Sequence, residues 1–153
     1  MIIQPIIDLV EICYQKGITQ VILSPGSRCA PLTLAFARHP AISSRTISDE
    51  RAAAFIALGM AQQLGKPVAL VCTSGSAAMN YFPAVAEAFF QEIPLVVITA
   101  DRPTEWIDQY DGQTVFQPDL YGKHVKKSFR FPDSFESPDQ AWHANRICNE
   151  AIN

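Results

Sequence analysis

The sequence predicts a doubly wound α/β fold, a mostly parallel sheet with helices on both faces. Two apolar runs, Pro67 to Cys72 and Pro94 to Thr99, have strand length and contain no charged residue, which is typical of parallel strands covered on both faces. Segments with helical spacing of apolar residues lie between the strand candidates. The repeated order of strand and helix therefore favours a parallel sheet.

The first half of the chain alternates regularly. A helix from Pro5 is expected to stop at Lys16 and Gly17, a typical C-terminal signal. The elements expected after it are a strand at Val21 to Leu23, a helix at Ala30 to Arg38, a strand at Arg45 to Ser48 and a helix at Ala52 to Leu64.

The second half starts with the two apolar strands and becomes less regular after Arg102 and Pro103. We expect a helix at Ala77 to Gln91, short helical turns at Thr104 to Asp108 and at Thr114 to Tyr121, a strand at Lys127 to Phe131 and a last helix from Ser137. Residues 1–153 are expected to form one domain, cut before its last strand.

Composition excludes several classes of protein. The 153 residues carry 12 basic and 15 acidic side chains mixed along the chain, so no nucleic-acid footprint is expected. No run reaches the length of a membrane span. The four cysteines are scattered, with no C-x-x-C pair that would build a zinc site. We expect a reduced, cytoplasmic protein with no metal ligands of its own.

Five polar clusters fall where strand candidates end. They are Ser24 to Arg28, Ser48 to Arg51, Thr73 to Ser76, Thr99 to Pro103, and Asp111 to Gln113. In an open α/β sheet these ends share one edge, which is where ligands bind. Glu50 stands out among them, although the first turn of a helix stabilises any carboxylate there.

Each cluster also has an ordinary structural explanation. Ser27 and Arg28 lie in a tight loop whose N–H groups and guanidinium could bind a carboxylate or phosphate. The same loop could equally be an ordinary turn without a ligand. Thr73 to Ser76 offers free N–H groups and hydroxyls at a helix start, where Ser74 or Ser76 could equally be a cap.

The remaining clusters leave similar alternatives open. Asp101 could pair with Arg102 or Arg51 as a structural bridge, and Gln113 could contact a substrate or lie in a turn without function. The fingerprints of dinucleotide-binding loops, P-loops and serine hydrolases are absent.

Taken in order, the clusters resemble the N-terminal, pyrimidine-binding domain of thiamine-diphosphate enzymes. The motifs SPGSR, SDERAAAFIALGMA, PVALVCTSGSAAMNYFPAVAEA and PLVVITADRP are most similar to the 2-succinyl-5-enolpyruvyl-6-hydroxy-3-cyclohexene-1-carboxylate synthase family of menaquinone and phylloquinone biosynthesis. The sequence departs from that pattern at Cys29, where a hydroxyl or amide residue is common, and at Gly112, where asparagine is common.

The resemblance implies roles for these residues. Glu50 would hydrogen-bond N1′ of the aminopyrimidine, so that N4′ can remove the thiazolium C2 proton, and its carboxyl should be desolvated. Thr73, Ser74, Gly75 and Ser76 would lie near the cofactor. Ser27, Arg28, Arg102 and Gln113 would surround isochorismate, which receives a succinyl unit from 2-oxoglutarate.

The resemblance also implies what this chain lacks. In the family, magnesium and the diphosphate are held by a C-terminal domain, and the cofactor site forms between two subunits of a homo-oligomer. The isolated chain should be inactive. The alternatives are the same domain of an acetolactate synthase or 2-oxo acid decarboxylase, in which histidine precedes the glutamate where Asp49 stands here, and a stand-alone module that binds a small anion.

Overall fold

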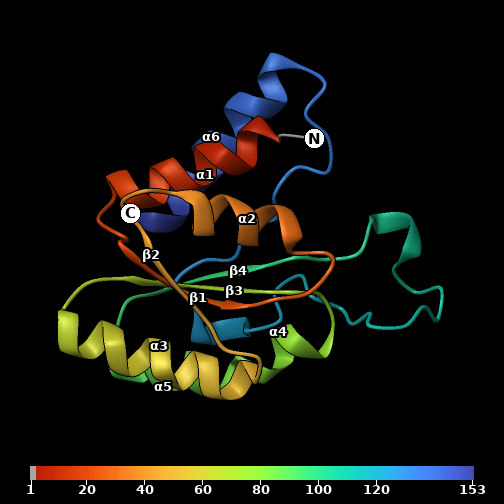
Figure 1. Cartoon of the computed structure of the whole chain (residues 1–153). Coiled ribbons are helices and arrows are strands. Elements are labelled where there is room, and N and C mark those ends of the chain that lie inside the picture. The colour runs from red at the N-terminus through yellow and green to blue at the C-terminus, as the bar shows by residue number, and fades with distance from the viewer. Residues whose placement is uncertain (1–2) are drawn as a thin grey trace.

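The computed structural model describes residues 3–153 and contains a four-stranded, fully parallel sheet in the order β2-β1-β3-β4 (Figure 1). The strands are β1 Gln20–Ser24, β2 Ser43–Thr46, β3 Val68–Cys72 and β4 Leu95–Thr99. β1 pairs with β2 and β3, with Ile22 opposite Arg45 on one side and Leu70 on the other. Three of the four strands therefore fall where the sequence predicts them, and β2 begins two residues earlier.

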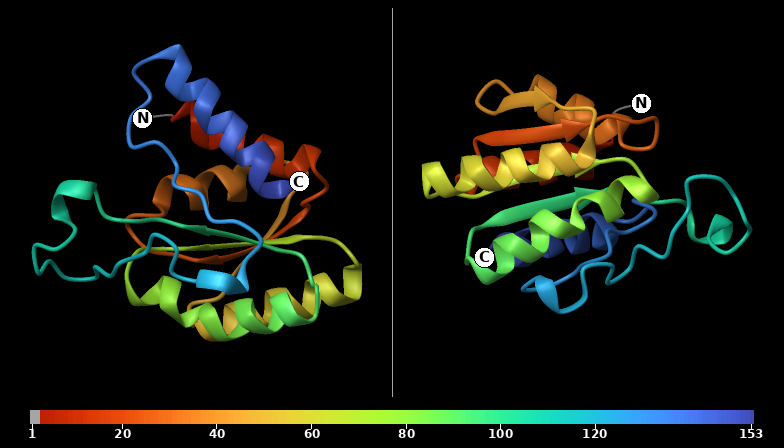
Figure 2. Two further views of the ribbon diagram at one scale, coloured as in Figure 1. Left: turned by 180° about the vertical axis from the view of Figure 1, so that it is seen from behind. Right: turned by 90° about the horizontal axis from the view of Figure 1, so that it is seen from below.

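Helices cover both faces of this sheet, which confirms the predicted fold class (Figure 2). The six α-helices of the described chain are α1 Gln4–Gln15, α2 Ala30–Arg38, α3 Glu50–Leu64, α4 Ser76–Asn80, α5 Phe82–Phe90 and α6 Pro138–Ile152. Helices α1, α2 and α6 lie over one face, and α3, α4 and α5 lie over the other.

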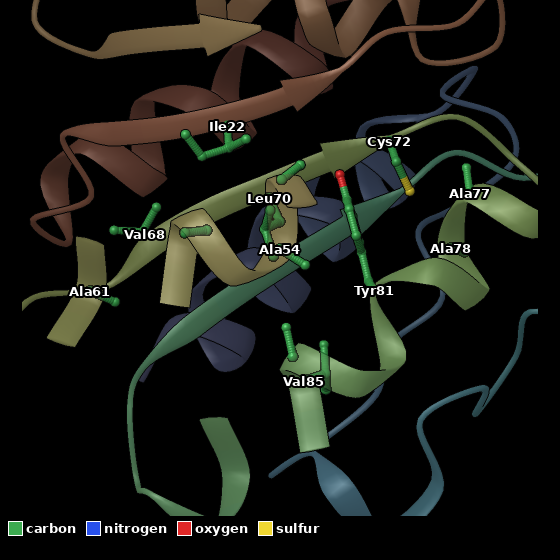
Figure 3. Close-up of a cluster of buried hydrophobic side chains, with 13 residues drawn as sticks. Ile22, Ala54, Ala61, Val68, Leu70, Cys72, Ala77, Ala78, Tyr81 and Val85 are labelled. Atoms are coloured by element: carbon green, nitrogen blue, oxygen red, sulfur yellow. The ribbon is translucent and has the colours of Figure 1, made fainter. Parts of the chain in front are cut away.

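The two faces have separate cores because side chains alternate along each strand. Ile22 and Leu70 pack with the alanines of α3 and with α5, whereas Val21 and Val71 pack with α1, α2 and α6. Figure 3 shows the first of these clusters, in which Tyr81 extends from the junction of α4 and α5 to the sheet. Small alanines let α3 approach the sheet closely.

Local signals set the ends of α3. The Asp49 side chain accepts a hydrogen bond of 2.7 Å from the N–H of Ala52, so it caps the helix. Gly65 ends the helix in the left-handed conformation, with φ of 60°. Glu50 is thereby fixed as the first residue of α3.

Two of the expected helical segments differ in the structure. The helix predicted from Ala77 to Gln91 is two helices, α4 and α5, that meet at the buried Tyr81 with Pro83 in the first turn of α5. The stretch from Thr114 to Tyr121 holds turns but no helix, although a short helical turn does occur at Thr104–Trp106 as predicted. Another short turn follows at Gly122–His124.

Lys127 to Phe131 forms no strand. Lys127 forms an ion pair of 3.4 Å with Glu150 of α6, and Phe131 packs on the core beneath that helix. The alternating charged and aromatic side chains of this segment therefore contact α6 and the core beneath it, and they do not pair with a neighbouring strand.

β4 also departs from expectation, because all five of its residues are half-buried and not fully covered. It is the edge strand, and no strand of the described residues pairs with its outer side. Within residues 3–153, no helix combines the length and apolar character needed to cross a bilayer.

Candidate functional site

The predicted polar clusters meet at the carboxyl edge of the sheet, next to its topological switch point. β2 and β3 lie on opposite sides of β1, so the crevice beyond the ends of β1 and β3 is where a ligand site is expected. The two loops touch there: a Cβ on Gly26 would lie 2.5 Å from the Cβ of Thr73. Only glycine at position 26 allows this approach.

Gln113 joins the two loops. Its carbonyl oxygen accepts a hydrogen bond of 3.0 Å from the Ser74 hydroxyl, and its side-chain Oε1 accepts one of 2.7 Å from Nη1 of Arg28. Its φ of 61° is uncommon for a residue other than glycine. The structure thus brings Arg28 and Gln113 together, although they are 85 residues apart.

Arg102 lies next to the same segment. Its Nη2 donates to the carbonyl of Gly112 at 2.7 Å and pairs with the Asp111 carboxylate at 2.6 Å. Within residues 3–153, Asp101 forms no ion pair with the Arg102 or Arg51 guanidinium, so the alternative of a structural bridge is wrong. Instead, Asp101 accepts a hydrogen bond of 2.7 Å from the Arg102 backbone N–H, and burial raises the pKa of its carboxyl.

Glu50 is half-buried at the start of α3, and within residues 3–153 its carboxylate has no hydrogen-bond or ion-pair partner. Burial is the main cause of the raised pKa of the Cys72 thiol at the end of β3, and the charge of Glu50 makes a smaller contribution in the same direction. Glu50 therefore lies close enough to the end of β3 to act there electrostatically.

The segment Thr73 to Ser76 is less open than expected. Among its polar groups, the Ser74 hydroxyl is bound to Gln113, and the Gly75 N–H donates to Oε1 of Gln117 at 2.8 Å. The expectation of free groups is wrong for these two residues. Thr73 Oγ1 is buried and has no hydrogen-bond partner among the described residues, and Ser76 is exposed.

The alternative role of Ser74 or Ser76 as a helix cap is also wrong. The N-cap of α4 is Gly75, with φ of 83°, and no side chain caps this helix. A Cβ on Gly75 would lie 2.7 Å from the Gln113 carbonyl oxygen. Glycine is therefore required here by both backbone conformation and contact.

Two residues of this region were not singled out from the sequence. The buried Tyr81 hydroxyl donates to the Val71 carbonyl at 3.0 Å and lies 3.3 Å from the Ser24 hydroxyl, so it supports the ends of β1 and β3 from below. Gln117 bonds to Gly75 and to the end of β4. Neither has a sequence signal, because one looks like a core aromatic and the other lies in a loop without periodicity.

Other parts of the described structure show fewer features of a ligand-binding site. A hollow of about 590 Å³, lined by α3 together with Gln20 of β1 and Arg45 of β2, contains none of the predicted site residues. Among residues 3–153, no group of three or more histidine, cysteine or acidic side chains is placed to hold a metal ion. Ser27 is exposed on the loop that carries Arg28.

Comparison with known proteins assigns the family. The sequence model of the family described as "Thiamine pyrophosphate enzyme, N-terminal TPP binding domain" matches residues 8–125 of the chain. The chain belongs to this family. The match covers every strand and every residue of the candidate site.

Individual relatives carry the name of the family that the sequence motifs resemble. The chain is 55% identical over 149 residues to a 2-succinyl-5-enolpyruvyl-6-hydroxy-3-cyclohexene-1-carboxylate synthase of Cytophaga hutchinsonii, covering 97% of this chain and 27% of that protein. It is 50% identical over 145 residues to the enzyme of the same name from Porphyromonas gingivalis, covering 95% and 25%. The chain thus spans about a quarter of the length of these curated relatives.

Proposed function

We propose that this chain is the pyrimidine-binding part of a thiamine-diphosphate-dependent synthase that decarboxylates 2-oxoglutarate and adds the succinyl unit to isochorismate. The observation that carries the proposal is the Glu50 carboxylate, which has no partner among the described residues and stands at the ligand-binding edge of the sheet. The names of relatives at 55% and 50% identity support the substrates.

The residues present fit the aminopyrimidine end of the cofactor. Glu50 would hold a proton at N1′, and Thr73 Oγ1, a buried hydroxyl oxygen without a partner, fits a polar group of the ring. The cofactor ring would be lined on the same side by Ser74, Gly75 and Ser76. Ser74 and Gly75 would contribute by fixing the backbone of this loop, since their polar groups are bound to Gln113 and Gln117. When bound, the cofactor supplies the carbanion chemistry of decarboxylation and addition.

The substrate side would be built by Ser27, Arg28, Arg102 and Gln113. Both arginines lie within hydrogen-bond distance of the segment from Asp111 to Gln113, so two guanidinium groups are gathered at one edge. Guanidinium groups bind carboxylates well, and isochorismate is a dianion. The exposed Ser27 hydroxyl and the Gln113 amide would add neutral hydrogen bonds.

The rest of the active site would come from outside this chain. We propose that a C-terminal domain holds magnesium and the diphosphate, and that a second subunit completes the site in a homo-oligomer. The four cysteines, all reduced and buried, suit a reducing compartment, so we place the protein in the cytoplasm. Alone, this chain should not turn over substrate.

The test is an assay of the full-length protein with thiamine diphosphate, magnesium, 2-oxoglutarate and isochorismate. Consumption of both substrates with release of carbon dioxide supports the proposal. Turnover with pyruvate alone would instead indicate an acetolactate synthase or decarboxylase. A well-folded protein that binds the cofactor but consumes neither substrate would reject the assignment.

A further inference from the structure

We infer that Gln117 is a positioning residue that fixes the segment from Asp111 to Gln117 on the sheet edge, so that Gln113 and the two arginines meet the substrate in one arrangement. The identity of the substrate in this inference rests on the proposed function. The anchoring by Gln117 rests on the hydrogen bonds of the structure alone.

The Gln117 amide makes three hydrogen bonds to two neighbouring strand ends. Its Oε1 accepts from the Gly75 N–H at 2.8 Å, and its Nε2 donates to the Ala100 carbonyl at 2.8 Å and to Thr99 Oγ1 at 3.3 Å. One side chain therefore joins the loop after β3 to the end of β4. The side chain is partly buried, so water competes less for these bonds than it would at an exposed site.

This anchor acts on Gln113 through a short length of chain. Four residues upstream of Gln117, the Gln113 carbonyl is held by the Ser74 hydroxyl at 3.0 Å. The hydrogen bonds of Gln113 and Gln117 therefore fix both ends of the segment 113–117. Between them they set where the Gln113 side chain meets Arg28 and where the Gly112 carbonyl meets Arg102.

The contacts require a primary amide at position 117. Gly75 offers a donor and Ala100 an acceptor, and an amide satisfies both at once. Glutamate would keep the acceptor but place its second oxygen against the Ala100 carbonyl. Methionine has a similar length and offers neither bond, so it removes the anchor with little change in volume.

The experiment compares Gln117→Met and Gln117→Glu with Gln109→Met in the full-length protein. Gln109 lies in the same loop, is exposed and makes no side-chain hydrogen bond within the described residues. Three quantities are measured: hydrogen exchange of the backbone amides of residues 111–117, the KM and kcat for isochorismate, and hydrogen-deuterium exchange at C2 of the bound cofactor.

We expect both Gln117 variants to raise amide exchange in residues 111–117 by roughly tenfold and to raise the KM for isochorismate by a similar factor, with C2 exchange unchanged. Gln109→Met should alter none of the three. A general loss of folding would slow C2 exchange as well, so an unchanged C2 rate separates positioning from simple destabilisation.

Two results would overturn the inference. One is amide exchange in the Gln117 variants equal to that of Gln109→Met. The other is faster amide exchange with an unchanged KM in an active enzyme. If the unsubstituted protein does not consume isochorismate, the proposed function fails, and the amide exchange alone still decides whether Gln117 is the anchor.

Discussion

The guanidinium of Arg102 is bound to the carboxylate of Asp111, with 2.6 Å between Nη2 and Oδ2. The same nitrogen donates to the Gly112 carbonyl, and the Arg102 side chain is only 19% exposed. A substrate carboxylate that reaches Arg102 therefore meets a cation that already has an anionic partner. Substrate and Asp111 compete for one group.

Asp111→Asn should therefore lower the KM for isochorismate in the full-length protein. Because the pair is partly exposed, the expected change is roughly two- to fivefold, corresponding to about 0.5–1 kcal/mol. Steady-state kinetics on Asp108→Asn provide the control, since Asp108 lies in the same loop, is exposed and makes no ion pair among the described residues. Equal changes in both variants would show that only net charge matters.

Glu50→Gln should slow hydrogen exchange at C2 of the bound cofactor by at least about a hundredfold, the usual contribution of a group that handles a proton. The reason is that an amide cannot hold the proton at N1′ as a carboxylate does. Nuclear magnetic resonance of quenched samples measures the rate. Glu136→Gln, at an exposed site, should leave the rate unchanged, and near-normal exchange in Glu50→Gln would remove Glu50 from the mechanism.

Gly75→Ala should destabilise the chain more than Gly65→Ala. Both glycines have positive φ, but Gly65, with φ of 60° and ψ of 28°, lies in the left-handed helical region, where alanine costs about 1–2 kcal/mol, whereas Gly75, with φ of 83° and ψ of −138°, lies in a region used almost only by glycine. Only at Gly75 does the new methyl group meet another atom, the Gln113 carbonyl oxygen at 2.7 Å. Urea denaturation should show the larger loss for Gly75→Ala, and equal losses would contradict both the backbone conformation of Gly75 and its close contact with Gln113.

Gly26→Ala and Gly59→Ala should change stability in opposite directions. At Gly26 the methyl group would overlap Thr73, at an expected cost of about 1–3 kcal/mol. Nothing lies within 4 Å of a Cβ at Gly59 inside α3, so alanine there should stabilise the helix by about 0.5–1 kcal/mol. Thermal unfolding of the two variants provides the comparison, and a neutral Gly26→Ala would contradict the close approach of the two loops.

The thiols of Cys13, Cys72 and Cys148 should react slowly at pH 8 in the folded chain. Burial raises the pKa of Cys13 and of Cys72 to about 12, and that of Cys148 to about 11. The thiolate is the reactive form, so a disulfide reagent should label these residues only after unfolding. Fast labelling of Cys13 or Cys148 in the native chain would contradict the packing of α1 against α6.

The same raised values predict how stability depends on pH. In the unfolded chain these thiols ionise near 9.0, whereas in the folded chain they keep their protons until about pH 11 to 12. The stabilisation is therefore fully present below pH 9 and is lost as the pH rises through the folded values. Denaturation curves between pH 8 and 11 should show the free energy of unfolding falling, and a flat profile would be evidence against burial.

The sheet could be predicted from sequence because its strands are short apolar runs with polar residues after them. The predicted Val21 to Leu23 lies within β1, and Pro67 to Cys72 includes β3. What periodicity could not show was strand order. Whether an apolar strand such as β4 is covered or lies at an edge depends on its neighbours, and these are decided by tertiary packing.

The candidate site could be located but its internal contacts could not. Strand ends in a parallel sheet share one edge, so Arg28, Glu50 and Arg102 had to lie on the same side of the molecule. The fold of the loop after β4 depends on bonds from Gln113 and Gln117 to residues about 40 positions away. No local pattern in the sequence encodes such contacts.

The two sheet edges differ in a way that bears on how this chain behaves in solution. β2, with the sequence Ser-Ser-Arg-Thr, presents an exposed and charged edge, whereas β4, with Leu-Val-Val-Ile-Thr, presents a half-buried edge without charge or proline. Edges of the second kind are templates for pairing with another strand, and charge or proline is the usual protection against it. Aggregation of this chain during expression or refolding should therefore begin by strand pairing at the free edge of β4.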